Sequence, residues 1–99
     1  MQGWYAASFE REMGCTEADL LRWLPGAVQP HGWVVRVGSA EVTIGSGRLD
    51  LHWSELSARR IALMQMPRLA VTFSFDGISE DERQRFMRHF DLYTQRGGG

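Results

Sequence analysis

The stretch RLDLHWSELSARRIALMQMPRLAVTFSF, residues 48–75, decides the fold of this protein. Apolar and polar residues alternate along most of it, which is the pattern of β-strands that turn one face toward a core. The stretch SEDERQRFMRHFDLYTQR, residues 79–96, follows it and repeats its apolar residues at helical spacing. Together the two stretches predict an antiparallel sheet with one apolar face and a long C-terminal helix that covers this face.

We expect three strands within residues 48–75. Residues 48–53 alternate cleanly, and residues 54–57 suggest a short connection. Residues 59–66 are apolar on both faces, which indicates a strand that is covered on both sides or that uses its second face for binding. Pro67 should end this strand, because proline cannot donate a hydrogen bond to a neighbouring strand, and residues 69–75 should form the next one.

The C-terminal helix has a well-defined start. Ser79 and Glu82 have the spacing of a capping box, in which each side chain accepts a hydrogen bond from the backbone of the other residue. Phe86, Phe90 and Tyr93 recur along one face and should pack on the sheet. We expect the three glycines at residues 97–99 to form a disordered tail.

The N-terminal part of the chain predicts one strand and one short helix. Residues 4–9 fit a strand, and a helix is the alternative there. Thr16 has the position of a helix N-cap, with Asp19 as its capping-box partner. We expect Pro25 and Gly26 to end this helix after about two to three turns.

Two further strands are predicted at residues 33–37 and 40–44, joined by a hairpin turn at Gly38 and Ser39. The resulting order is strand, helix, five strands and helix. We therefore expect an α+β fold, in which an antiparallel sheet of five to six strands packs against the short N-terminal helix and the long C-terminal helix. This order of elements and the expected two-layer architecture are similar to those of helix-grip folds, which often hold apolar ligands between sheet and helix.

The composition is that of a small globular protein. The chain has 99 residues, which suits one globular domain over residues 1–96, and its formal net charge of −1 gives no bulk attraction to nucleic acid or anionic lipid. All basic residues are arginines, which indicates a GC-rich genome and a bacterial type of composition. Cys15 is the only cysteine, and residues 1–12 lack the pattern of a signal peptide. We expect a soluble, cytoplasmic protein without a membrane segment.

Apolar residues near residues 59–66 suggest a binding surface. Met64 and Met66 offer an adaptable apolar surface, which favours an apolar small molecule or a partner protein, a second copy of the chain included. Our leading hypothesis is a small non-enzymatic binding or accessory domain that uses this region.

Arginines in the same region support an alternative function. Arg59, Arg60 and Arg68 form the densest basic cluster, and Trp53 is close to them in sequence. Basic residues beside an exposed aromatic side chain are typical of sites for single-stranded nucleic acid, and they also suit phosphate. The acidic residues elsewhere and the net charge make nucleic acid the weaker hypothesis.

A small enzyme that uses Cys15 and His31 is the second alternative. Cys15 precedes the first predicted helix, where backbone amides can lower the pKa of a thiol, and His31 would be its base. His31, His52 and His89 lack the spacing of metal ligands, so we expect no metal centre. We also find no cofactor-binding motif.

Overall fold

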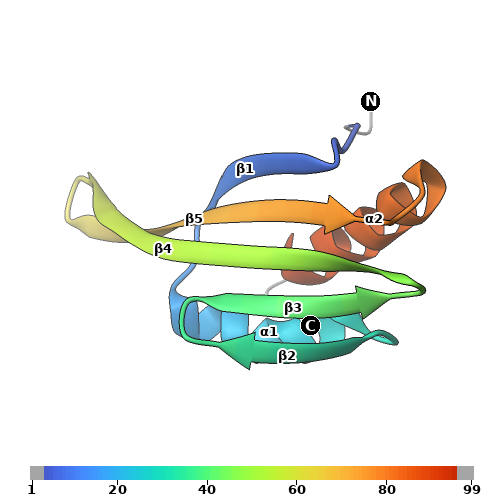
Figure 1. The fold of residues 1–99 in the computed structure, drawn as a ribbon. Coiled ribbons are helices and arrows are strands. Elements are labelled where there is room, and N and C mark those ends of the chain that lie inside the picture. Colours follow the sequence, from blue (N-terminus) through green and yellow to red (C-terminus); the bar gives the residue numbers. More distant parts are fainter. Residues whose placement is uncertain (1–3, 96–99) are drawn as a thin grey trace.

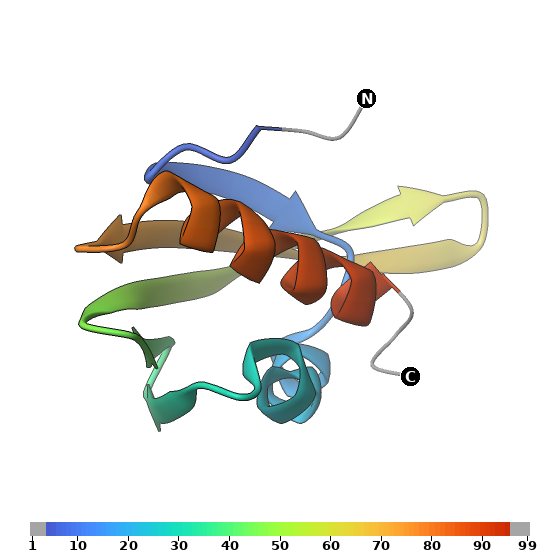
Figure 2. The same cartoon turned by 90° about the vertical axis from the view of Figure 1, so that its right-hand side faces the viewer.

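The protein is an α+β fold in which two helices cover one face of a five-stranded antiparallel sheet (Figures 1 and 2). The computed structural model describes residues 4–95, so the predicted helix end at Arg96 and the predicted tail at residues 97–99 lie outside it. The elements are β1 (Ser8–Met13), α1 (Glu17–Val28), β2 (Gly32–Arg36), β3 (Ser39–Ile44), β4 (Gly47–Ile61), β5 (Met64–Asp76) and α2 (Glu80–Gln95). The strand order is β1-β5-β4-β3-β2. The predicted fold class is confirmed, with five strands.

The core lies between the helix-covered face of the sheet and the two helices. Leu51 of β4 and Phe73 of β5 are directly opposed on this face and are fully buried. Phe90 of α2 is also fully buried and packs edge-on against Phe73, with the ring centroids 5.4 Å apart. The apolar alternation of the central strands and the apolar stripe of the C-terminal helix therefore meet as predicted.

Both helices begin where the sequence predicts. The Thr16 hydroxyl accepts a hydrogen bond from the Asp19 amide at 3.1 Å, and the Asp19 carboxylate accepts one from the Thr16 amide at 3.2 Å. The Ser79 hydroxyl accepts a hydrogen bond from the Glu82 amide at 3.2 Å. These bonds satisfy amide donors that have no partner inside the helix. Among residues 4–95, no helix has the length and apolar character that crossing a membrane requires.

The predicted end of α1 at Pro25 and Gly26 is wrong, because the helix continues to Val28. Ala27 and Val28 are fully buried, so the last turn contributes to the core. Gly26 lies directly against the ring of Tyr93 in α2, where a Cβ atom would come within 2.2 Å of the ring. The close packing of the two helices thus outweighs the weak helix propensity of these two residues.

The predicted division of residues 48–75 into three strands is also wrong. β4 runs through residues 54–57, and the chain reverses at Ala62 and Leu63, so residues 59–66 form the end of a long β4–β5 hairpin. The pairing shifts register between Leu56 and Arg59, and Pro67 lies opposite this irregularity. The hydrogen bonds between the strands are interrupted there, so the lack of an amide hydrogen in Pro67 costs no strand hydrogen bond.

The predicted strand at residues 4–9 is displaced in the structure. β1 starts only at Ser8, because the Tyr5 backbone is bonded to the Gln84 side chain of α2 instead of to a strand. The Tyr5 amide donates to Gln84 Oε1 at 3.2 Å, and Gln84 Nε2 donates to the Tyr5 carbonyl at 2.8 Å. The turn between β2 and β3 is also shifted by one residue and consists of Val37 and Gly38. Gly38 has a φ of +72°, a left-handed conformation that favours glycine.

Candidate functional site

The end of the β4–β5 hairpin extends beyond the rest of the fold (Figures 1 and 2). We call residues 56–68 the hairpin tip. Leu63 at its turn is 101% exposed, and Met64 is 64% exposed. The other exposed apolar side chains of the hairpin tip are Leu56, Ile61 and Met66. The predicted alternative of a strand covered on both sides is therefore wrong, since this segment is open to solvent.

Three apolar side chains of the hairpin tip share one face of the sheet with Arg59. Ile61 is directly opposite Met64, and Arg59 is directly opposite Met66. Directly opposed residues of antiparallel strands point to the same side, with their Cβ atoms about 5 Å apart. Ile61, Met64 and Met66 therefore form one apolar surface, on the face of the sheet that carries no helix.

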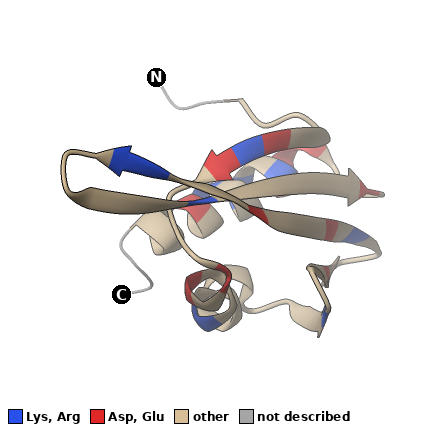
Figure 3. Ribbon diagram, turned by 90° about the vertical axis from the view of Figure 1, so that its left-hand side faces the viewer, with Lys and Arg blue, Asp and Glu red and all other residues tan. Residues whose placement is uncertain are grey.

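Two of the three arginines in the predicted cluster form ion pairs with an acidic residue of the neighbouring strand. Arg68 and Arg59 both pair with the Glu12 carboxylate of β1, at 3.1 Å and 3.6 Å. Arg68 also donates to the Ser57 carbonyl at 2.7 Å, which holds it along the hairpin. Arg60 pairs with Gln65 across the strands and has no ion-pair partner within residues 4–95. Figure 3 shows these basic residues near the end of the hairpin and the acidic residues of β1 beside it.

Trp53 does not belong to the same surface. It lies on the helix-covered face of β4, is only 7% exposed, and its indole donates a 2.7 Å hydrogen bond to the Glu17 carboxylate of α1. The aromatic platform that the nucleic-acid hypothesis requires beside Arg59, Arg60 and Arg68 is therefore not formed by this residue.

Cys15 and His31 lie at opposite ends of α1. The helix has 12 residues, which corresponds to about 18 Å between them. Cys15 is 2% exposed, and burial of the thiol, with a smaller contribution from the Asp19 charge, raises its pKa. The structure thus does not bring this pair together, and the thiol lacks the environment of an activated nucleophile.

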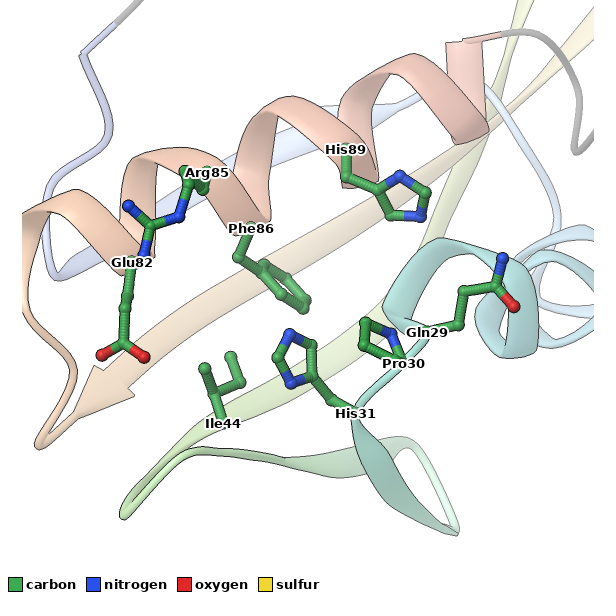
Figure 4. A pocket seen from close by; sticks show the side chains of 8 residues that line it. All are labelled: Gln29, Pro30, His31, Ile44, Glu82, Arg85, Phe86 and His89. Atoms are coloured by element: carbon green, nitrogen blue, oxygen red, sulfur yellow. The ribbon is translucent and has the colours of Figure 1, made fainter.

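A hollow that the sequence did not indicate lies between α2 and the chain that follows α1 (Figure 4). Its volume is about 290 Å³. It is lined by Gln29, Pro30, His31, Ile44, Glu82, Arg85, Phe86 and His89. These residues come from three separate segments of the chain, and no local spacing rule connects them.

Two histidines hold fixed positions at this hollow. The His89 Nε2 atom is 2.9 Å from the Gly26 carbonyl oxygen, so Nε2 carries the proton and donates to it. The His31 ring lies against the Phe86 ring, with the centroids 5.8 Å apart. Within the described part of the chain, no three His, Cys, Asp or Glu side chains converge in a way that could hold a metal ion.

A second exposed apolar segment lies at the far edge of the sheet, on β2. Trp33, Val34 and Val35 are exposed there, and Val37 at the following turn is 103% exposed. An edge strand has unpaired backbone groups along one side and can pair with another chain. The opposite edge, β1, instead carries charged residues.

Comparisons with known proteins identify no relative. No protein-family model matches the chain, no curated protein matches it, and no solved structure matches its fold. The geometry of the hairpin tip and of the hollow is therefore the basis on which a function can be proposed.

Proposed function

We propose that this protein is a non-enzymatic binding domain that docks onto a partner protein through the hairpin tip. The observation that carries this proposal is the exposure of Leu63 and Met64 at the end of a hairpin that extends beyond the fold. Contiguous exposed apolar surface on a soluble domain is typical of an interaction site. Methionine side chains adapt well to such surfaces because they are flexible and polarizable.

The apolar side chains of the hairpin tip do not belong to the buried core, which supports a role in binding. The core is complete without them, since Phe73, Phe90 and Leu51 are already fully buried between sheet and helices. The pairing of β4 and β5 continues to Ile61 and Met64, and no helix lies over this end of the hairpin. Apolar residues at such positions gain burial only when another molecule covers them.

The chemistry of the hairpin tip favours a partner with an apolar groove and an acidic border. Ile61, Met64 and Met66 would enter the groove, and Arg59, which is directly opposite Met66 on the same face, would meet a carboxylate on its border. Arg59 and Arg68 both pair with Glu12, which compensates part of their positive charge, so they attract an acidic partner only weakly. An apolar small molecule enclosed between sheet and helix, as in helix-grip folds, receives less support because that space is filled by side chains.

Site-specific photo-crosslinking in cells that make the protein tests the proposal. A photoreactive phenylalanine analogue replaces Leu63, and the matched control replaces Val37, which is equally exposed at the turn of the other hairpin. We expect a discrete adduct with one protein from position 63 and none from position 37. Met64→Glu, added to the position-63 variant, should abolish the adduct because it places a charge in the apolar contact.

Three other results would reject a heterologous partner at the hairpin tip. Adducts from position 37 alone would place the interface at β2. A dimer adduct in the purified protein, with matching concentration-dependent sedimentation, would make a second copy the occupant. Co-sedimentation with vesicles of phosphatidylcholine and phosphatidylserine, lost in Leu63→Asp, would make the hairpin tip a membrane contact.

A further inference from the structure

The hollow beside α2 has an apolar floor that is suited to a flat ring. Ile44 of β3 and Phe86 of α2 are buried beneath it. The Pro30 ring and the His31 ring form its wall, and His31 is already packed against Phe86 at a centroid distance of 5.8 Å. A volume of about 290 Å³ is at the small end of ligand sites, so it suits a ligand of one ring.

The border of the hollow carries an arginine that is available to an anion. Arg85 is exposed and has no ion-pair partner within the part of the chain that the structure describes. Glu82 is the carboxylate at the same border, but it is engaged at the helix start, where it accepts a 3.4 Å hydrogen bond from the Ser79 hydroxyl. Its other oxygen lies beside Gly45, toward the end of β3. The guanidinium group therefore keeps its donors free for a planar, bidentate partner.

Polar groups at the other end of the hollow complete the site. His89 donates from Nε2 to the Gly26 carbonyl, so its Nδ1 atom is the ring nitrogen that is not engaged there. Gln29 also lines the hollow at this end, although its amide group is directed away from the Phe86 and His31 rings (Figure 4). The hollow thus combines an apolar floor with the Arg85 cation, the Glu82 carboxylate that is engaged at the helix start, and a few polar groups, which is a composition found in small-molecule sites.

We infer that this hollow binds a small aromatic carboxylate. The carboxylate group pairs with Arg85, and the ring lies over Phe86 and Ile44 beside His31. This site is separate from the hairpin tip and does not depend on the proposed partner protein.

Titration of the full chain with benzoate, followed by amide and side-chain NMR, tests the inference. Benzoate should produce saturable shifts at His31, Phe86 and His89, and none at the hairpin tip. Benzamide has the same ring without the charge and should bind about tenfold or more weakly, because it cannot form charge-assisted hydrogen bonds with Arg85. Inorganic phosphate, which lacks the ring, should also bind more weakly.

Two arginine variants locate the binding group. Arg85→Gln should weaken benzoate about tenfold or more, whereas Arg88→Gln should leave it unchanged, since Arg88 is on the same helix but lines a different hollow. Both side chains are exposed, and thermal melts of the two variants check that the fold is intact. The inference is overturned by an absence of saturable shifts, by equal binding of benzamide, or by greater sensitivity to Arg88→Gln than to Arg85→Gln.

Discussion

Arg11 of β1 forms an ion pair with Asp91 of α2, with 2.7 Å between Nη1 and Oδ1. The Arg11 guanidinium group also lies 5.2 Å from the centroid of the Phe73 ring, so it rests on the aromatic core. The Tyr5 hydroxyl donates a hydrogen bond to the same carboxylate. Asp91 therefore connects the edge strand and the chain that precedes it to the C-terminal helix.

Asp91→Asn should destabilise the protein by about 1–3 kcal/mol, because it removes the negative charge that compensates a partly buried guanidinium group. Urea denaturation of the purified protein measures this loss. Asp50→Asn is the matched control, since its pair with Arg48 is more exposed and should contribute much less to stability. Equal losses in the two variants would mean that the Arg11 pair has no special role in joining β1 to α2.

Phe90→Ala should lower the free energy of unfolding by about 3–5 kcal/mol, as aromatic truncations in cores do. The ring is fully buried between Phe73 and Phe86, so its removal leaves a cavity. Leu92→Ala on the exposed side of α2 is the control and should have a small effect. A melting temperature of Phe90→Ala within a degree or two of wild type would contradict the packing of α2 on the sheet.

Gly26→Ala should destabilise the protein by about 1–3 kcal/mol through overpacking, although alanine is the better helix former. The new methyl group would lie within 2.2 Å of the Tyr93 ring. In a Tyr93→Ala background the same change should be neutral or stabilising, because the obstructing ring is gone. Gly14→Ala, which meets no atom within 4 Å, controls for the change in backbone entropy. A stabilising effect of Gly26→Ala in the otherwise native protein would show that Tyr93 moves aside without cost.

Cys15 should react slowly with iodoacetamide in the folded protein. Burial and the Asp19 charge raise its pKa, so the reactive thiolate is a small fraction at neutral pH, and access is also restricted. Mass spectrometry of samples labelled between pH 6 and pH 8 measures the rate, with the urea-unfolded protein as the fast reference. Rapid labelling of the folded protein at pH 6 would revive the enzyme hypothesis.

The protein should not bind single-stranded DNA or RNA detectably at physiological salt. Arg59 and Arg68 are paired with Glu12, and Trp53 is buried, so the hairpin tip offers neither a strong basic groove nor a stacking surface. Fluorescence anisotropy measures the affinity. A sub-micromolar dissociation constant that is lost in the Arg59→Ala, Arg60→Ala double variant would favour the nucleic-acid alternative, as would a steep decrease with salt.

Local patterns in the sequence determined the class of the fold. The alternation of residues 48–53 and 69–75 places their apolar side chains on one face, because side chains of a strand alternate by geometry. Thr16 and Ser79 determined the helix starts, since their side chains bind amides only three residues away. Such signals depend on neighbouring residues alone and can be read without the tertiary structure.

The tertiary structure decided where these elements end and what they expose. α1 continues past Pro25 because buried side chains and the contact between Gly26 and Tyr93 stabilise its last turn. β4 and β5 continue past Pro67 because a register shift on the opposite strand accommodates a residue without an amide hydrogen. The first effect depends on a residue far away along the chain, and the second depends on the neighbouring strand of the same hairpin.

In the candidate sites too, the sequence determined some features and the tertiary structure decided the others. The sequence indicated Met64 and Met66 as an apolar surface, but only the register of the hairpin places both side chains on the face of the sheet that carries no helix, where they are exposed. Trp53 is buried because α1 lies over it and supplies Glu17 as its hydrogen-bond acceptor. The hollow with His31 and Arg85 exists only because α1 and α2 pack side by side, which brings together segments separated by about half the chain. Periodicity determines the face on which a side chain lies, and only packing decides what covers that face.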